Sequence, residues 1–314
     1  MALLTKPTGN SLVAARKPLR PGLVLFLMSL PFVLLILAFN YLPLLGWSIA
    51  FVDYQPGMKI LDCKFIGLTQ FARIFSLGSD FGMVMRNTLV LSFLGIICSP
   101  VPIVLALMLA EVKKPAFSRA VQTITSFPYF ISWILIFGVV YIVLAQSDSV
   151  LNTILFKLHL ITRPVNVLAN PDIVWPFQTL LTIYKTAGWQ AIIYLAAIAG
   201  IDPELYDAAE VDGAGRLGKM RYITIPGLMP TYTVLLLLQI SNVLSNGFEQ
   251  YYVFHNALVH DKIAVLDYYL YQTGLGDQQF SYSTAMGIFK TVVSVTLLFS
   301  ANWISKKVRG ESII

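Results

Sequence analysis

The sequence predicts an all-α, polytopic membrane protein with about six transmembrane helices. Of its 314 residues, 57% are hydrophobic and only 12% are charged, and the mean hydropathy is +0.72. A soluble domain carries roughly 25% charged residues, so this chain could not cover a water-facing surface. Its uncharged residues form long runs, and runs of about 18 or more are what an apolar bilayer core requires of a helix. Lipid is therefore the expected solvent for most of the chain.

The first apolar run begins after Arg20 and contains no charge until Asp53. It is longer than the apolar core of a signal peptide, which has about 7 to 15 residues, so we expect a retained transmembrane helix. Further spans, bounded by charges or by Pro and Gly, are expected near residues 87–110, 120–146, 174–200, 231–248 and 283–304.

These spans predict four parts of the chain. The first part is a cytoplasmic segment, residues 1–20. The second part, residues 21–83, contains the first transmembrane helix and an extracytoplasmic loop. Residues 84–304 form the main transmembrane domain, and 305–314 form a cytoplasmic tail.

Lysine and arginine in alternate connections predict the orientation, because cytoplasmic loops carry the excess of positive charge. One side holds thirteen of these residues: Lys6, Arg16, Lys17, Arg20, Lys113, Lys114, Arg119, Arg216, Lys219, Arg221, Lys306, Lys307 and Arg309. The other side holds seven: Lys59, Lys64, Arg73, Arg86, Lys157, Arg163 and Lys262. Both termini and the loop 201–230 are therefore predicted to be cytoplasmic.

The net charge of +6 is distributed in short clusters between the apolar runs, which is typical of membrane topology and not of a nucleic-acid surface. The histidines His159, His255 and His260 lack metal-ligand spacing, and two cysteines are too few for a disulfide framework. We expect no metal site and no nucleic-acid partner.

The loop 201–230 has signals of a structured helical hairpin. Asp202 is a good N-cap and Pro203 suits the first helical position, so a short helix is expected over 203–212. Gly213 and Gly215 can both supply the left-handed conformation that ends a helix. A second short helix is expected over 216–224, ending before Pro226.

The first of these helices is acidic, the second is basic, and Ala208 and Ala209 leave room for a close partner. One interpretation is a dipolar element that binds a soluble protein of complementary charge. The other is that the acidic turn complements the helix dipole and keeps the loop solvated. Composition alone leaves both interpretations open.

The spacing of Asp207-Ala208-Ala209, Gly213, Ile223 and Ile225-Pro226 resembles the EAA loop of ABC importer permeases. Asp207 stands where that family usually has Glu, and Ile225 where it often has Leu. Further landmarks resemble the carbohydrate-uptake branch over roughly residues 84–304: Asn87-Thr88-Leu89, Lys185-Thr186-Ala187-Gly188-Trp189, Gly247-Phe248-Glu249-Gln250 and Ala301-Asn302.

This resemblance implies a type I ABC importer transmembrane domain in the bacterial inner membrane. It implies that the loop is a coupling helix for a cytoplasmic ATPase, with these candidate residues: Asp207, Ala208, Ala209, Glu210, Asp212 and Gly213. The implied partners are two ATPase subunits, a second, similar permease in a heterodimer, and an extracellular solute-binding protein. The cargo would be a sugar or oligosaccharide.

The sequence contains no G-x-x-x-x-G-K-[ST] phosphate loop, so we expect no enzyme activity and no cofactor on this chain. ATP and Mg would bind the partner subunits.

Two lysines fall within predicted spans, where a cation is costly unless it is paired or hydrated. Lys185 and Lys290 could meet the substrate, or they could bond to carbonyls or snorkel. Asn242, Ser245, Asn246 and Phe248 are candidate sugar contacts in the outer half of the fifth span, although such polar groups also bond neighbouring helices.

An ion- or proton-coupled secondary transporter is the alternative function. It would need a titrating acid in the membrane, and the predicted spans contain no central Asp or Glu. A membrane enzyme is less consistent still, since no catalytic constellation occurs within the spans.

Overall fold

The computed structural model describes residues 21–76, 80–144 and 149–309, which belong to two compact units divided between Ser48 and Ile49. The predicted N-terminal segment 1–20 and tail residues 310–314 lie outside the described residues. The positive charges Lys6, Arg16, Lys17 and Arg20 therefore have no structural description.

The first unit contains helix α1, Pro21–Ile36, and a π-helical turn η1, Leu37–Tyr41. A 3-10 helix η2, Leu42–Phe51, begins in this unit. Large apolar side chains on α1 are exposed, including Phe26 at 59% and Phe32 at 68%. A helix that is apolar on every side is typical of a membrane span, as predicted for this run.

Among its described residues, the second unit consists of helices joined by turns and loops, with one isolated β-bridge between Val52 and Phe65. In chain order its helices are η3 Ile60–Asp62, α2 Thr69–Ile74, α3 Phe81–Ile97, α4 Val101–Ala110, α5 Pro115–Ser126, η4 Phe127–Phe130, α6 Trp133–Leu144, α7 Val150–Lys157, η5 Val167–Ala169, α8 Val174–Ala199, α9 Pro203–Val211, α10 Arg216–Lys219, η6 Met220–Thr224, α11 Ile225–Ser241, α12 Glu249–Phe254, α13 His260–Ile263, α14 Leu266–Tyr271, η7 Gln272–Gly276 and α15 Phe280–Arg309. The predicted all-α class is confirmed.

Membrane-spanning stretches follow the predicted order. Among described residues, four are long and apolar enough to cross a bilayer: Leu25–Phe51, Phe81–Ala110, Arg216–Ser241 and Phe280–Lys307. A fifth is possible if the bent pair Pro115–Phe130 and Trp133–Leu144 counts as one span. At the remaining predicted position lies α8, whose 26 residues reach about 39 Å. It is more polar than the others and carries Lys185.

The span predicted near 120–146 is sharply bent. The chain bends by 99° between η4 and α6. Pro128 lies in η4, where it has no N–H to donate and its ring obstructs the preceding turn. The carbonyls at the bend are bonded by a side chain from α8, as described below.

The prediction that the second helix of the loop ends before Pro226 is also wrong. Residues Arg216–Ser241 form one helix, and the fifth span therefore starts and ends earlier than the predicted 231–248. The π-helical turn η6 ends at Thr224, two residues before Pro226, and changes the hydrogen-bond register there, so the missing N–H does not stop the helix.

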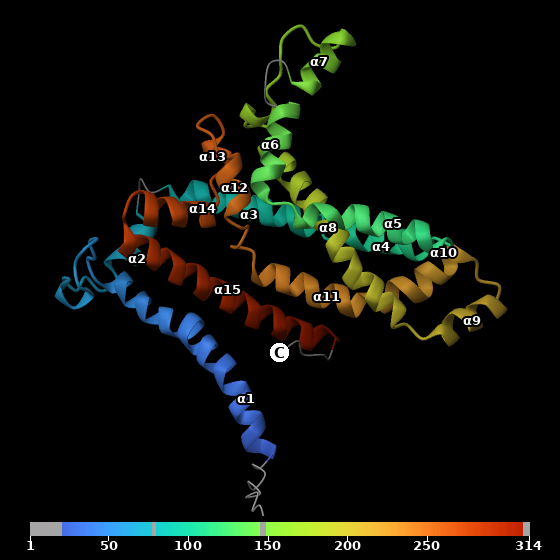
Figure 1. Cartoon of the computed structure of the whole chain (residues 1–314), viewed down its shortest axis with the longest axis horizontal. Helices are drawn as coiled ribbons and strands as arrows, with labels where there is room; N and C mark the ends of the chain where they lie inside the picture. Colours follow the sequence, from blue (N-terminus) through green and yellow to red (C-terminus); the bar gives the residue numbers. More distant parts are fainter. Residues whose placement is uncertain (1–20, 77–79, 145–148, 310–314) are drawn as a thin grey trace, which may run out of the picture. The chain divides into compact units, whose positions relative to one another are not determined.

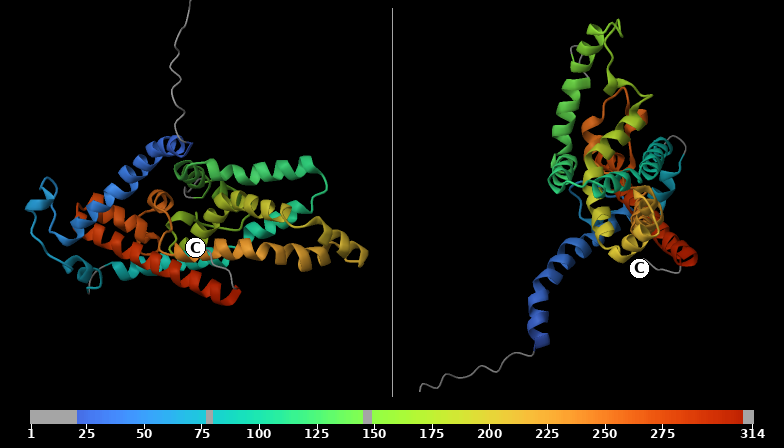
Figure 2. Two further views of the ribbon diagram at one scale, coloured as in Figure 1. Left: turned by 90° about the horizontal axis from the view of Figure 1, so that it is seen from below. Right: turned by 90° about the vertical axis from the view of Figure 1, so that its right-hand side faces the viewer.

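Two hydrophobic clusters form the core of the second unit. One joins α3, α8, α12, α14 and α15, and it includes Val84, Phe254, Leu266 and Met286. The other joins α4, α8 and α11 around Ile103, Tyr194 and Leu228. Both Figure 1 and Figure 2 place α9 and α10 at one end of this unit and α2 and α14 at the other.

Candidate functional site

The predicted loop helix forms with the expected caps. An Asp202 side-chain oxygen accepts from the Glu204 N–H at 3.0 Å, and Pro203 is the first residue of α9. Gly213 has φ +78°, and the Ala214 N–H donates to the Ala209 carbonyl at 2.8 Å. This closes α9 with a left-handed turn. Gly215 instead has φ −71°, so its predicted left-handed conformation is wrong, because one such residue already ends the helix.

All the predicted coupling residues lie at the surface, and only Ala209 is half-buried. Asp207, Ala208, Glu210, Asp212 and Gly213 are exposed. Large apolar side chains that were not among the predicted residues share this surface: Leu205, Val211 at 88% exposure, Leu217 at 79% and Tyr222. The sequence does contain an indication of them, because bulky apolar residues are unusual within a short, charged helical hairpin. Exposed apolar patches with a polar rim are typical of protein–protein or membrane interaction surfaces.

One acid of the hairpin has a partner within it. The Lys219 ammonium donates to Glu210 at 2.6 Å. This hydrogen bond and the Lys219 charge hold the pKa of Glu210 below its usual value. Asp207 and Asp212 have no ion pair among described residues. The acidic face is thus only partly neutralised by the basic helix.

At the other end of the continuous helix lies a polar cavity of about 180 Å³. Its lining comes from α3, α8, α11, α12 and the segment after α11: Leu91, Ser92, Gly95, Thr179, Thr182, Ile183, Gln239, Asn242, Ser245, Asn246 and Tyr251. Three of the four predicted sugar contacts meet here. These residues were predicted to lie within the fifth span. They lie instead at its end and beyond it, because α11 ends at Ser241 and Asn242 is its C-cap.

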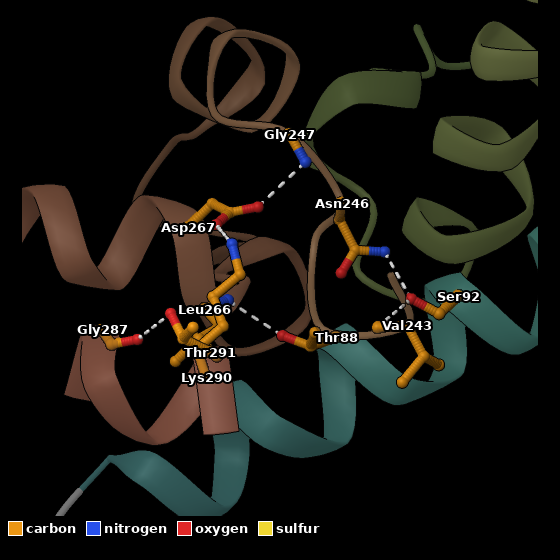
Figure 3. Close-up of polar contacts among 10 residues, drawn as sticks. All are labelled: Thr88, Ser92, Val243, Asn246, Gly247, Leu266, Asp267, Gly287, Lys290 and Thr291. Carbon is orange, nitrogen blue, oxygen red and sulfur yellow. Dashed lines mark hydrogen bonds and ion pairs between the residues drawn. The ribbon is translucent and has the colours of Figure 1, made fainter. Parts of the chain in front are cut away.

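Asn246 holds the most constrained position in this cavity. Its amide nitrogen donates to the Ser92 hydroxyl at 2.9 Å, and that hydroxyl donates to the Val243 carbonyl at 2.5 Å (Figure 3). Its amide oxygen is buried and has no hydrogen-bond partner among described residues. A buried acceptor costs about 1–3 kcal/mol when unpaired, so this atom is suited to a ligand donor.

Polar residues of α8 form a part of the site that sequence reasoning missed. Thr179 and Thr182 line the cavity. Beside them the Gln250 amide donates to Gln178 Oε1 at 2.8 Å, and Thr182 donates to Gln250 Oε1 at 3.0 Å. The signal was a polar stripe at helical spacing in an otherwise apolar span.

Phe248, the fourth predicted contact, does not line this cavity. Its ring packs on Tyr252 and Tyr271, with centroid distances of 5.1 and 4.5 Å. The residue stabilises the segment between α11 and α12 against the neighbouring aromatic rings.

The Lys185 ammonium bonds to the bend between η4 and α6. It donates to the carbonyls of Pro128 at 3.3 Å, Tyr129 at 3.0 Å and Ile131. Nearby, Gly188 allows α8 to approach α5 closely, because a Cβ there would lie 2.0 Å from the Thr125 carbonyl oxygen. Carbonyl pairing was one of the two interpretations of Lys185.

Lys290 forms an ion pair with Asp267 of α14, and both side chains are largely buried. The second Asp267 oxygen accepts from the Gly247 N–H at 3.0 Å, as Figure 3 shows. The pair therefore links α15 and α14 to the segment that carries Asn246.

Asn87 and Thr88 anchor the same region. The Asn87 amide donates to the carbonyls of Asp261 and Ala264, and the Thr88 hydroxyl accepts from the Leu266 N–H at 2.9 Å. These contacts fix α13 and α14 on α3.

Comparisons with known proteins agree with this architecture. The family described as "Binding-protein-dependent transport system inner membrane component" matches residues 99–310. The polygalacturonan/rhamnogalacturonan transport system permease protein YteP of Bacillus subtilis (strain 168) is 41% identical over 290 residues, covering 92% of this chain and 89% of YteP. Protein LplB of the same organism is 37% identical over 312 residues, covering 99% and 96%.

Two solved structures share the fold. A chain of a bacterial ABC transporter involved in the import of the acidic polysaccharide alginate superposes with a TM-score of 0.82 at 35% identity, covering 91% of this chain and 96% of that one. A chain of the alginate transporter in complex with an alginate pentasaccharide-bound periplasmic protein has a TM-score of 0.84 at 34% identity, covering 93% and 96%. This chain belongs to the binding-protein-dependent transport-system inner-membrane-component family, and it is a permease rather than an enzyme.

Proposed function

We propose that this chain forms half of the translocation pathway of an ABC importer for an oligosaccharide delivered by an extracellular solute-binding protein. The names of its relatives support the cargo class. YteP is named as a polygalacturonan/rhamnogalacturonan transport permease, and AraP of Bacillus subtilis is named as an arabinooligosaccharide transport permease. The observation that carries the proposal is one continuous helix, Arg216–Ser241, with the exposed hairpin at its first end and the polar cavity at its last.

The hairpin around α9 is the proposed docking site for a cytoplasmic ATPase. Its residues Asp207, Ala208, Ala209, Glu210, Asp212 and Gly213 combine charge, small side chains and a left-handed turn. Exposed Leu205, Val211 and Leu217 add apolar area that a partner groove would cover. ATP and Mg would bind the two ATPase subunits, and this chain supplies the contact.

The cavity residues Asn242, Ser245 and Asn246 are the proposed saccharide contacts. Amides and hydroxyls recognise sugar hydroxyls by hydrogen bonds, and the unpaired Asn246 oxygen offers an acceptor. Lys185 and Lys290 already have partners in the protein, so we assign them to the frame of the pathway instead of substrate contact.

In the proposed assembly, this chain forms a heterodimer with a second, similar permease in the inner membrane of a bacterium. Both termini of the chain lie in the cytoplasm. The proposed parts of the chain are a cytoplasmic segment 1–20, the first helix and extracytoplasmic loop within 21–83, the transmembrane domain 84–304 and a cytoplasmic tail 305–314. Cysteine labelling tests this topology: Val211→Cys should react only with reagents that reach the cytoplasmic side, and Leu258→Cys only from outside.

Reconstitution tests the function directly. The chain should have no ATPase activity alone and should gain substrate-stimulated activity when co-expressed with its ATPase subunits, second permease and binding protein. Uptake of labelled galacturonate and arabinose oligomers would identify the cargo. Uptake driven by an ion gradient without ATPase subunits would refute the proposal and favour a secondary transporter.

A further inference from the structure

The coupling hairpin is attached to one membrane helix by three successive contacts. Ile201 occupies space left by Gly227, because a Cβ at Gly227 would lie 2.7 Å from Ile201 Cδ1. The Tyr206 hydroxyl lies 3.0 Å from the Thr224 hydroxyl, and Glu210 pairs with Lys219 at 2.6 Å. Residue numbers rise along the first segment of the hairpin, from Ile201 to Glu210, and fall along the second, from Gly227 to Lys219. The three contacts therefore join two antiparallel segments, from the membrane to the tip of the hairpin.

The Tyr206–Thr224 contact differs from the other two. Glu210 is 77% exposed, and exposed ion pairs contribute little because solvent screens them. The Ile201 contact is apolar and has no preferred direction. The hydroxyl pair is directional, and Thr224 is only 6% exposed. Of the three, this contact best fixes the rotation of α9 relative to α11.

Thr224 ends the π-helical turn that joins α10 to α11. Its hydroxyl donates to the Lys219 carbonyl at 3.5 Å, so in this arrangement Tyr206 donates to Thr224. The coupling helix is thus bonded to the irregular turn that lets the long helix pass Pro226. π-helical turns of this kind occur often at functional sites.

The side of the hairpin that faces α4 and α8 is packed less completely. Met220 contacts the apolar cluster of α4 and α8, but a cavity of about 170 Å³ lies beside it. The cavity is lined by Leu107, Ala110, Glu111, Ile198, Tyr206, Met220 and Thr224. The backbone joins α9 to α8, and the three side-chain contacts join α9 to the helix Arg216–Ser241, so a force on α9 reaches that helix through these contacts.

We propose that the Tyr206–Thr224 hydrogen bond is the contact that makes α9 and the helix Arg216–Ser241 move as one body. This inference rests on the proposed function. Displacement of α9 by an ATPase would then reach Asn242 and Asn246 through a single helix. Tyr206 is a positioning residue: it touches neither substrate nor nucleotide, and it determines how much of the ATPase motion reaches the cavity.

The test uses the complete complex, with binding protein, in proteoliposomes. Tyr206→Phe and Thr224→Val each remove one hydroxyl while keeping shape, and Thr224→Ser restores the hydroxyl. Thr233→Val is the matched control, since its hydroxyl lies on the same long helix and donates to the Met229 carbonyl of its own turn at 2.8 Å. Uptake and ATP hydrolysis are measured together, and their ratio reports coupling.

Tyr206→Phe and Thr224→Val should each lower the uptake per ATP by about fivefold, the equivalent of one typical hydrogen bond. ATP hydrolysis should persist, the double variant should be no worse than either single variant, and Thr224→Ser and Thr233→Val should couple normally. Wild-type ratios in both single variants, or additive losses in the double variant, would overturn the inference. Failure of the proposed function is distinguishable, because the wild-type complex would then show no ATP-driven uptake at all.

Discussion

Replacing Lys185 with Met tests whether this cation supports the bend in the third span or meets the substrate. The Met side chain keeps most of the apolar stem and removes the ammonium. The carbonyls of Pro128, Tyr129 and Ile131 then lose their charged donor. The Pro128 carbonyl keeps the Ile131 N–H as a donor at 3.2 Å, but the 99° bend at this point prevents regular helical hydrogen bonds to the other two carbonyls.

The magnitude follows from those contacts. Hydrogen bonds to a charged group contribute about 1.5–3 kcal/mol each, but three on one ammonium are not additive. The site is also partly exposed, so the expected loss of stability is about 3 kcal/mol. Lys185→Arg, which keeps the charge and offers more donors, should retain most of this stability.

The assay measures two quantities on the purified complex: its melting temperature in detergent and the apparent KM for oligosaccharide uptake after reconstitution. A structural lysine predicts a lower melting temperature with an unchanged KM among complexes that assemble. An unchanged melting temperature with a raised KM would refute this reasoning and place Lys185 in the substrate pathway.

Three further outcomes are expected. Lys290→Met should destabilise the complex by about 2 kcal/mol, because it leaves Asp267 with no charge partner in a largely buried site, and Asp267→Asn in the same chain should recover part of the melting temperature. Asn246→Ala should lower oligosaccharide uptake about tenfold, the effect of losing one good ligand hydrogen bond, while basal ATP hydrolysis is kept. Gly213→Ala should weaken ATPase binding in co-purification, because a side chain at φ +78° costs about 1–2 kcal/mol, whereas Gly215→Ala in extended backbone should be nearly neutral.

A specific result would contradict each of these three predictions. Equal melting temperatures for Lys290→Met and wild type would show that the ion pair contributes nothing to stability. Wild-type uptake by Asn246→Ala would remove that amide from the pathway. Equal ATPase recovery with the Gly213 and Gly215 variants would mean that the left-handed turn is not needed for docking.

The local features of this chain were predictable from sequence because short-range chemistry determines them. Asp202 and Pro203 start α9 as expected, and Gly213 ends it, since caps depend on neighbouring backbone groups alone. The all-α membrane class followed from apolar runs, which reflect the requirement that backbone groups in lipid bond within one helix. The proposed coupling residues could be named from sequence because their spacing lies within one contiguous loop.

The long-range features were decided by the tertiary structure. The pairing of Lys290 with Asp267, 23 positions away, joins two helices, and no local spacing indicates it. At the bend in the third span, Lys185 from another helix donates to the exposed carbonyls, and the helix after the coupling loop continues through Pro226 because a π-helical turn changes its register. In both cases a proline removes a local hydrogen bond, and the side chains and backbone turns around it decide whether the helix breaks.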